Sequence, residues 1–239
     1  MDSVLRKLNV DIIDEHYYQT PQWFFMNAGK YNHYDRKGPK IFLGEYACHS
    51  VRIGKPDNKN TQYCALAEAA FMTGLERNSD IVTMAAYAPL FAHVKDWQWT
   101  PNLIWFDNDT SYNTPSYYVQ QLFARNKGTH SISITENEEV IQGKDSVWAS
   151  AAIDEVKKEL IIKLVNASGE TKKKTIDISA IKIRNNKATV MTLAAEPEAV
   201  NSIVSPATVD PKTTHPTINR KGMAQSLPPY SLTVIKMQL

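Results

Sequence analysis

The feature that most constrains the fold of this chain is a change of hydrophobic pattern near residue 128. Up to that point, strand-like apolar runs alternate with helix-like segments; beyond it, only short runs with period-two alternation occur. Repeated strand–helix alternation is typical of parallel βα units. Short alternating runs separated by turn residues are typical of an antiparallel β-sandwich. The sequence therefore predicts an α/β portion over residues 1–128 and an all-β, jelly-roll-like sandwich over residues 129–239.

The α/β portion contains three predicted strands, each followed by a predicted helix. The strands cover residues 10–18, 40–47 and 81–87, and the last two are apolar runs of the kind buried in parallel sheets. The helices begin after Thr20, near residue 63 and at Pro115, and Gly128 is expected to end the last of them. Three βα units are too few to close a barrel or to form a stable open sheet. We therefore expect them to complete a larger structure whose natural N-terminus lies upstream.

The all-β portion contains six predicted strands and a long loop punctuated by Pro206, Pro211 and Pro216. The strands are expected at residues 132–134, 147–153, 160–165, 175–178, 188–193 and 231–237. A basic run at Lys172–Lys174 lies beside one of them without aromatic neighbours, so a solvated strand edge is favoured over a binding patch.

Composition excludes several classes of partner. The 239 residues carry a net charge of +2, which gives no reason to expect nucleic acid or an anionic membrane surface. No apolar run approaches the roughly 18 residues that a membrane helix needs. Cys48 and Cys64 are too few for a disulfide framework, and two free thiols are favoured over a single bridge. No leader sequence is evident at the start, but because an upstream N-terminus is expected, the compartment stays open.

The residues that remain for catalysis are carboxylates. The sequence lacks a phosphate-binding glycine loop, an HExxH motif, paired CxxC motifs and a GxSxG elbow, and its six histidines are too scattered for a metal site, so no cofactor is expected. Glu45 ends an apolar strand directly after Gly44. In a barrel of parallel strands this position faces the active-site mouth. Physical chemistry alone leaves open whether Glu45 is functional or paired with a neighbouring charge.

Two further groups of residues are candidates near the same mouth. Asp14, His16 and Tyr18 share one face of the preceding strand, so Tyr18 is able to donate a hydrogen bond to Glu45 or to a sugar. For Asp14 and His16, mutual pairing inside the barrel is favoured over contact with substrate. Trp97 and Trp99 lie in a polar loop after the third strand, where they either stack on sugar rings or pack the loop against the barrel.

Six motifs occur in a fixed order along the chain: VDIIDEHYY (10–18), GPKIFLGEYA (38–47), ALAEAAFMTGLERN (65–78), AYAPLF (86–91), PSYYVQ (115–120) and LPPYSLTV (227–234). Together they resemble the retaining α-L-arabinofuranosidases of glycoside hydrolase family 51, densely up to residue 128 and more thinly beyond. The resemblance implies the last three βα units of a (β/α)₈ TIM barrel followed by a β-sandwich.

The resemblance also implies roles for individual residues. Glu45 corresponds to the nucleophile, and Tyr18 to the tyrosine that hydrogen-bonds it. Some members carry a tryptophan four residues after the nucleophile, where this chain has His49, so that substrate-binding position is altered. The Asn-Glu pair of the fourth strand, which holds the acid/base glutamate, has no counterpart here.

The function implied is release of terminal arabinofuranosyl residues from arabinose-containing oligo- or polysaccharides, with His16, Tyr18, His49, Trp97 and Trp99 as substrate-binding candidates. Without an acid/base residue, we expect the chain alone to be inactive. With exposed strand edges, we expect it to oligomerise or to need the missing N-terminal half. The alternatives are a non-catalytic carbohydrate-binding or structural module, or a related hydrolase acting on β-glucan or xylan.

Overall fold

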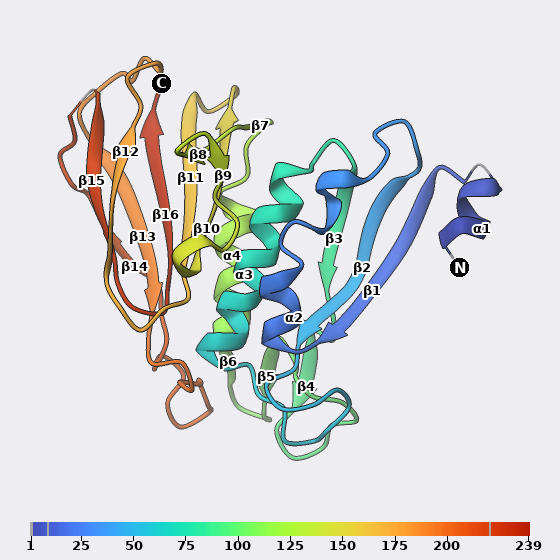
Figure 1. Ribbon diagram of the computed structural model, residues 1–239. Coiled ribbons are helices and arrows are strands. Elements are labelled where there is room, and N and C mark those ends of the chain that lie inside the picture. Colours follow the sequence, from blue (N-terminus) through green and yellow to red (C-terminus); the bar gives the residue numbers. More distant parts are fainter. Residues whose placement is uncertain (1, 9, 220) are drawn as a thin grey trace.

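The computed structural model describes residues 2–8, 10–219 and 221–239. Its elements are stacked in four layers (Figure 1): a parallel sheet, a layer of helices, a large antiparallel sheet and a small outer sheet. The helices lie between the parallel sheet and the large antiparallel sheet, so they bury apolar side chains on two sides.

The first layer is a three-stranded parallel sheet in the order β1-β2-β3. Its strands are β1 (Ile12–Gln19), β2 (Lys40–Cys48) and β3 (Val82–Tyr87), and a short helix α1 (Asp2–Lys7) precedes them. All three predicted strands are therefore confirmed. Their carboxyl ends point the same way, which brings the ends of β1 and β2 together at one edge of the sheet.

The second layer consists of helices whose starts follow from the sequence. Thr61 and Thr114 accept hydrogen bonds through their side chains from the third residue of α3 and α4, as helix N-caps do. The helices are α2 (Pro21–Met26), the 3₁₀ turn η1 (Lys30–His33), α3 (Gln62–Arg77) and α4 (Pro115–Arg125). The prediction that Gly128 ends α4 is wrong, because Asn126 already caps it by donating its backbone N–H to the carbonyl of Phe123.

Strand β3 differs from its prediction as a buried strand. Thr83, Met84 and Ala85 are exposed, whereas only Val82 and Tyr87 at the two ends are buried. The helices cover one face of the parallel sheet, and within the described ranges no element covers the other face (Figure 1). An apolar run thus identified the strand correctly but did not fix its degree of burial.

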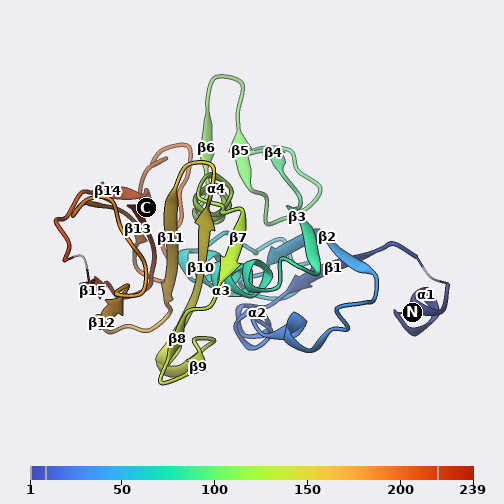
Figure 2. The same ribbon diagram turned by 90° about the horizontal axis from the view of Figure 1, so that it is seen from above.

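A small sheet that the sequence did not predict lies at the carboxyl end of the parallel strands. It contains β4 (Phe91–His93), β5 (Ile104–Phe106) and β6 (Ser111–Asn113), and the β5–β6 hairpin projects from the molecule (Figure 2). Strands of three residues are too short for a period-two pattern to stand out. The region was therefore interpreted as a polar loop.

The third and fourth layers are made of strands almost entirely, as predicted for the all-β portion. The large sheet has the order β14-β13-β16-β11-β10-β7, and β12 and β15 form the small outer sheet. The bounds are β7 (His130–Ile132), β8 (Thr135–Glu136), β9 (Glu139–Val140), η2 (Lys144–Ser146), β10 (Val147–Asp154), β11 (Glu159–Asn166), β12 (Lys172–Asp177), β13 (Ala188–Ala194), β14 (Lys212–Thr214), β15 (Gly222–Leu227) and β16 (Ser231–Gln238). The predictions missed the two-residue strands β8 and β9, and they missed β14 and β15, which lie in the stretch assigned to a long loop and its continuation.

The central strands of the large sheet are buried on both faces. In β10, β11 and β16 nearly every residue is buried, instead of every second one. One face packs on the outer sheet through residues such as Leu164 and Ile235, and the other packs on α3 and α4 through Trp148 and Val234. The same helices therefore share one core with the sandwich and another with the parallel sheet.

The side chains meet one sequence expectation in full and another in part. Cys48 and Cys64 are both buried free thiols. In the basic run, Lys173 is exposed on β12, whereas Lys174 forms an ion pair with Glu136 at 2.7 Å. Among the described residues, no helix is long and apolar enough to cross a membrane.

Candidate active site

An irregularity in the pairing of β1 with β2 sets the position of Glu45. Leu43 lies opposite Glu15 and Glu45 lies opposite His16, so Gly44 is an extra residue without a partner, a β-bulge. The Asp14 carboxylate accepts a hydrogen bond from the Gly44 backbone N–H at 3.0 Å. A Cβ at residue 44 would collide with that carboxylate, so any larger residue there would displace the Asp14 side chain. The bulge brings Glu45 directly opposite His16.

Three side chains of β1 form a continuous polar chain with Glu45 of β2. The Tyr18 hydroxyl donates to Glu45 Oε2 at 2.6 Å. His16 Nδ1 lies 3.5 Å from the same oxygen, and His16 Nε2 lies 2.9 Å from Asp14 Oδ2. The side chains of Asp14, His16 and Glu45 keep roughly half of their surface exposed, so a ligand can reach them.

The Tyr18 hydroxyl is suited to be a permanent donor. Burial, followed by the hydrogen bond to Glu45, raises the pKa of Tyr18 above its ordinary value. The phenol therefore keeps its proton at any physiological pH, and it fixes the rotamer of the Glu45 carboxylate. One oxygen of Glu45 is held in this way, and no described side chain donates a hydrogen bond to the other.

Three rings stand beside this carboxylate. The ring centroids of Tyr18, His49 and Trp99 lie 5.7 to 5.8 Å from one another, each pair near edge-to-face geometry. Trp99 is 37% exposed and therefore presents ring surface to solvent. Trp97 precedes Trp99 in the same loop and is 38% exposed. Its ring packs edge-on against the ring of Trp105, and the two ring centroids lie 6.2 Å apart.

His49 does not occupy an accessible position. Its side chain is fully buried, and its Nδ1 accepts a hydrogen bond from the Gly54 backbone N–H at 3.3 Å and lies 3.1 Å from Asn58 Nδ2. Burial lowers the pKa of His49, so the ring is neutral at pH 7. Direct contact with a ligand would require movement of the loop over residues 50–60. In this structure His49 instead holds that loop under Tyr18 and Trp99.

Polar groups on the covered face of the parallel sheet hold the strands that carry the site. Glu15 accepts hydrogen bonds from the hydroxyls of Tyr17, Tyr31 and Tyr34 at 2.6 to 3.0 Å, and these bonds tie β1 to the segment around η1. Glu68 on α3 is fully buried and accepts a hydrogen bond from the backbone N–H of Cys48 at 2.9 Å. That bond holds the end of β2 three residues beyond Glu45.

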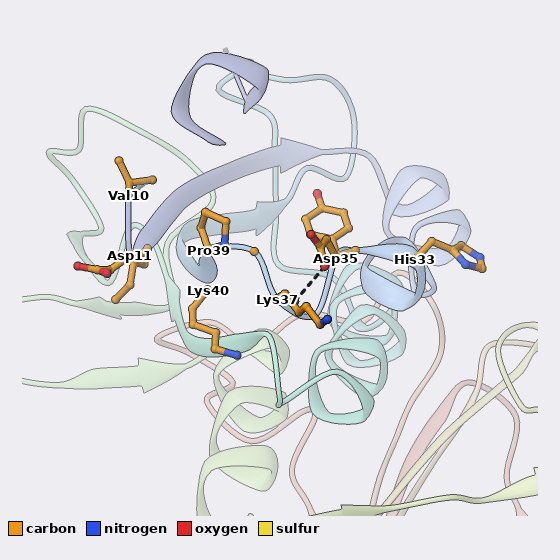
Figure 3. A pocket seen from close by; sticks show the side chains of 10 residues that line it. Val10, Asp11, His33, Asp35, Lys37, Pro39 and Lys40 are labelled. Atoms are coloured by element: carbon orange, nitrogen blue, oxygen red, sulfur yellow. Dashed lines mark hydrogen bonds between the residues drawn. The ribbon is translucent and has the colours of Figure 1, made fainter. Parts of the chain in front are cut away.

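A cavity of about 950 Å³ lies at the opposite end of the strands. Its lining includes Asp11 at the start of β1, Lys40 at the start of β2, and the connecting turn where the Lys37 backbone N–H donates to Asp35 at 2.9 Å (Figure 3). Catalytic residues of parallel barrels lie at the carboxyl ends of the strands, whereas the amino ends contribute stability. The size of this cavity therefore does not make it the candidate site.

The structure brings together most of the predicted site residues. Glu45, Tyr18 and His16 are in direct contact, and Trp99 joins them through the ring of Tyr18. His16 pairs with Asp14, the interpretation favoured from the sequence, and it also faces Glu45, whereas its contact with a substrate stays a prediction. Sequence reasoning missed the bulge at Gly44, although a glycine near the end of a strand is its usual signal.

Comparison with known proteins identifies the family. The family model described as "Alpha-L-arabinofuranosidase C-terminal domain" matches residues 44–231. α-L-Arabinofuranosidase 1 of Arabidopsis thaliana is 33% identical over 231 residues, which are 93% of this chain and 33% of that protein. An extracellular exo-α-L-arabinofuranosidase of Streptomyces chartreusis is 50% identical over 123 residues, which are 52% of this chain and 14% of that protein.

Solved structures agree with this assignment. An arabinose-bound family 51 α-L-arabinofuranosidase superposes with a TM-score of 0.87 at 33% identity, covering 95% of this chain and 37% of its own. The arabinose complex of the Thermotoga maritima enzyme has a TM-score of 0.76 at 22% identity, over 99% of this chain and 55% of its own, and supports the fold alone. The chain spans about a third of the Arabidopsis relative. These matches confirm the resemblance found in the sequence: the chain belongs to the α-L-arabinofuranosidase C-terminal domain family.

Proposed function

We propose that this chain carries the nucleophile of a retaining α-L-arabinofuranosidase, and that the nucleophile is Glu45. The observation that carries the proposal is the contact set of its carboxylate. One oxygen is held by the Tyr18 hydroxyl at 2.6 Å and faces His16, while the side chain stays open to a ligand. A carboxylate fixed on one oxygen and accessible on the other is suited to attack the anomeric carbon of a bound sugar.

In the proposed reaction, Glu45 forms a bond to the anomeric carbon of a terminal arabinofuranosyl residue as the glycosidic C–O bond breaks. The leaving oxygen takes a proton from a second carboxylic acid. Water then attacks the same carbon, gives a proton to that second residue and releases arabinose with retained configuration. Tyr18 orients the nucleophile, and the contact between Asp14 and His16 holds the His16 ring beside it.

The second carboxylic acid is the part of this reaction for which the chain offers no candidate. Among the described residues, the side chains that pair with Glu45 are those of Tyr18 and His16, and no other carboxyl group pairs with it. General acid assistance contributes about 10²–10⁴-fold in rate. We therefore propose that the acid comes from another part of the enzyme, and that these 239 residues alone do not turn over substrate.

The same proposal covers the architecture and the substrate contacts. Residues 1–128 would supply the last three βα units of a (β/α)₈ barrel, and residues 129–239 would be the attached sandwich. The open face of the parallel sheet, with Ile12 46% and Met84 45% exposed, is where the remaining strands would close the barrel or where copies of the chain would associate. Trp97 and Trp99 would contact the sugar rings of an arabinose-containing oligo- or polysaccharide, and His49 would act through the loop that it holds.

The test compares the chain alone with the chain in a complete enzyme. A chimera in which this chain replaces the matching segment of the Arabidopsis relative should hydrolyse an aryl α-L-arabinofuranoside, whereas the chain alone should not. In the chimera, azide should restore aglycone release to a Glu45→Ala variant and yield an arabinosyl azide of inverted configuration, because azide takes the place of the missing carboxylate.

Two outcomes would contradict the proposal. Activity of the isolated chain that depends on Glu45 would mean that it contains an acid of its own. A cooperatively melting chimera in which Glu45→Gln is as active as the unsubstituted protein would remove Glu45 from the mechanism.

A further inference from the structure

We propose that Glu68 of α3 is a positioning residue for the proposed nucleophile Glu45, which it holds in place through the end of β2. Glu68 is fully buried, and its Oε1 accepts a hydrogen bond from the backbone N–H of Cys48 at 2.9 Å. Cys48 is the last residue of β2, and Glu45 lies three residues before it on the same strand. The inference rests on the proposed function for the role of Glu45, whereas the contacts of Glu68 do not depend on it.

The bond from Cys48 to Glu68 takes the place of a strand pair. β3 ends at Tyr87, which lies opposite Tyr46, so the backbone N–H of Cys48 lies beyond the last pair on that side of β2. On the other side of β2, the next backbone N–H, that of His49, donates to a carbonyl of β1 at 2.8 Å. A buried backbone N–H without an acceptor costs about as much free energy as a lost hydrogen bond. Glu68 therefore supplies the acceptor that β3 no longer provides, and it fixes the end of β2 on the side away from β1.

The residue that follows the end of β2 links this anchor to the carboxylate of Glu45. His49 comes directly after Cys48, and its ring centroid lies 5.7 Å from that of Tyr18. The Tyr18 hydroxyl in turn donates to Glu45 Oε2 at 2.6 Å. A shift of Cys48 therefore moves the ring that packs on Tyr18, and the orientation of the Glu45 carboxylate changes with it.

The groups that face Glu68 keep its carboxyl uncharged at pH 7. They are buried thiols, phenols and one hydroxyl: Cys48 and Tyr46 of β2, Cys64 of α3, Tyr87 of β3 and Ser116 of α4. Among the described residues, no basic side chain pairs with Glu68. Burial raises the pKa of Glu68 to about 8, against the opposing effect of the hydrogen bonds from Cys48 and Ser116. Above pH 8 the carboxyl gains a charge that is stable only where water reaches it, which requires the end of β2 to move away from α3.

The first experiment needs no catalysis. The chain is labelled with ¹³C at its glutamate carboxyls, and the resonances of Glu45, Glu68 and Glu15 are followed by NMR from pH 6 to pH 10. We expect Glu68 to titrate near pH 8 and the Glu45 resonance to show a step with the same midpoint. Because the glutamine stays uncharged, the step should be absent from Glu68→Gln. Glu15 of β1 is the internal control, and its resonance should show no such step in either protein.

The second experiment measures kcat/KM against pH in the chimera with the Arabidopsis relative, with 2,4-dinitrophenyl α-L-arabinofuranoside as substrate. Dinitrophenolate leaves without a proton from a general acid, so an alkaline loss of kcat/KM with this substrate does not report the acid residue. We expect kcat/KM of the unsubstituted chimera to fall about tenfold per pH unit above pH 8, as one proton is lost. Glu68→Gln should remove that fall, which a merely structural role of Glu68 would not cause.

A Glu45 resonance that does not follow Glu68, or an alkaline fall of kcat/KM that persists in Glu68→Gln, would overturn the inference. The outcome is separable from that of the proposed function. Coupled resonances together with an inactive chimera would keep Glu68 as the residue that positions Glu45 and would remove the catalytic proposal. An active chimera without that coupling would do the reverse.

Discussion

The parallel sheet and the large antiparallel sheet face the same helices but use their faces differently. The antiparallel sheet is covered on both sides, by the outer strands and by α3 and α4. The parallel sheet is covered on one side only, and its open side carries Asp14, His16 and Glu45 with about half of each side chain exposed. The groups proposed to take part in the reaction thus lie where a face is left uncovered, whereas the large antiparallel sheet is covered on both faces.

Where the covered sheet does contain a charge, that charge is fully paired. Lys163 on β11 has no exposed side-chain surface, forms an ion pair with Glu76 of α3, and donates to the carbonyl of Asn126 at 2.7 Å. Burial lowers the pKa of Lys163, and the neighbouring Glu76 opposes that shift. By contrast, the charges of the open face form a chain that ends at an accessible carboxylate. The comparison predicts that substitutions on the open face change activity and those on the covered sheet change stability.

The largest effect is expected from Glu45→Gln in the chimera with the Arabidopsis relative. The amide cannot act as a nucleophile, so kcat should fall by on the order of 10⁴-fold, the scale found when a catalytic residue of this kind is removed. The midpoint of thermal unfolding should not fall, because the side chain is half-exposed and contributes no core packing. A loss of stability as large as that of a core substitution would contradict the expectation that substitutions on the open face change activity and not stability.

The next largest effect is expected from Lys163→Met in this chain. Removing one partner of a buried ion pair leaves the other uncompensated and costs about 3–5 kcal/mol. Denaturant unfolding should report that loss, and Lys173→Met on the exposed face of β12 is the matched control, with a change of less than about 0.5 kcal/mol. Equal losses of stability for the two substitutions would show that the interface between the large antiparallel sheet and the helices does not stabilise the fold more than the exposed face of β12 does.

A smaller effect is expected from Tyr18→Phe in the chimera. The variant keeps the ring contacts with His49 and Trp99 but loses the hydrogen bond to Glu45. A hydrogen bond to a charged group is worth about 1.5–3 kcal/mol, so kcat/KM should fall by roughly 10- to 150-fold. Unchanged kcat/KM would mean that the carboxylate is oriented by other contacts.

The smallest effect, per pH unit, is expected from Glu68, which lies between the two regions. Burial raises the pKa of Glu68 to about 8, whereas an unfolded glutamate has a pKa near 4.5. The folded state therefore keeps its full stability below about pH 4.5 and loses it as the pH rises toward 8, because the folded protein must then bury a charge. Relative to Glu68→Gln, the free energy of unfolding of the unsubstituted chain should fall by up to about 1.4 kcal/mol per pH unit in this window.

Chemical denaturation between pH 5 and pH 8 measures this difference. The glutamine retains an oxygen that can accept the hydrogen bond from the Cys48 backbone N–H, so the variant isolates the charge from the contact. Parallel stability curves for the two proteins would contradict burial of an ionisable group at this position.

Much of the α/β portion was predictable because its signals are local. Apolar runs marked β2 and β3, helix-like periodicity marked α3, Pro115 marked the start of α4, and a carboxylate after an apolar run and a glycine marked Glu45, which lies within β2. The small sheet β4–β6 was not predictable, because three-residue strands have no measurable period and owe their order to pairing across the loop. The same holds for the contact between Phe91 and Phe106, whose ring centroids lie 6.0 Å apart although the two residues are distant in the chain.

The sequence by itself determined the order and the type of most of the longer elements, since helix formation and hydrophobic period depend on near neighbours in the chain. Only the tertiary structure decided which faces are covered and how the site is assembled. Tyr18 and Glu45 are 27 residues apart, and a bulge at Gly44, locked by Asp14, sets the register that brings His16 opposite Glu45. Such contacts depend on the pairing of strands distant in the chain, and a local signal such as Gly44 indicates a bulge without giving the register across the two strands.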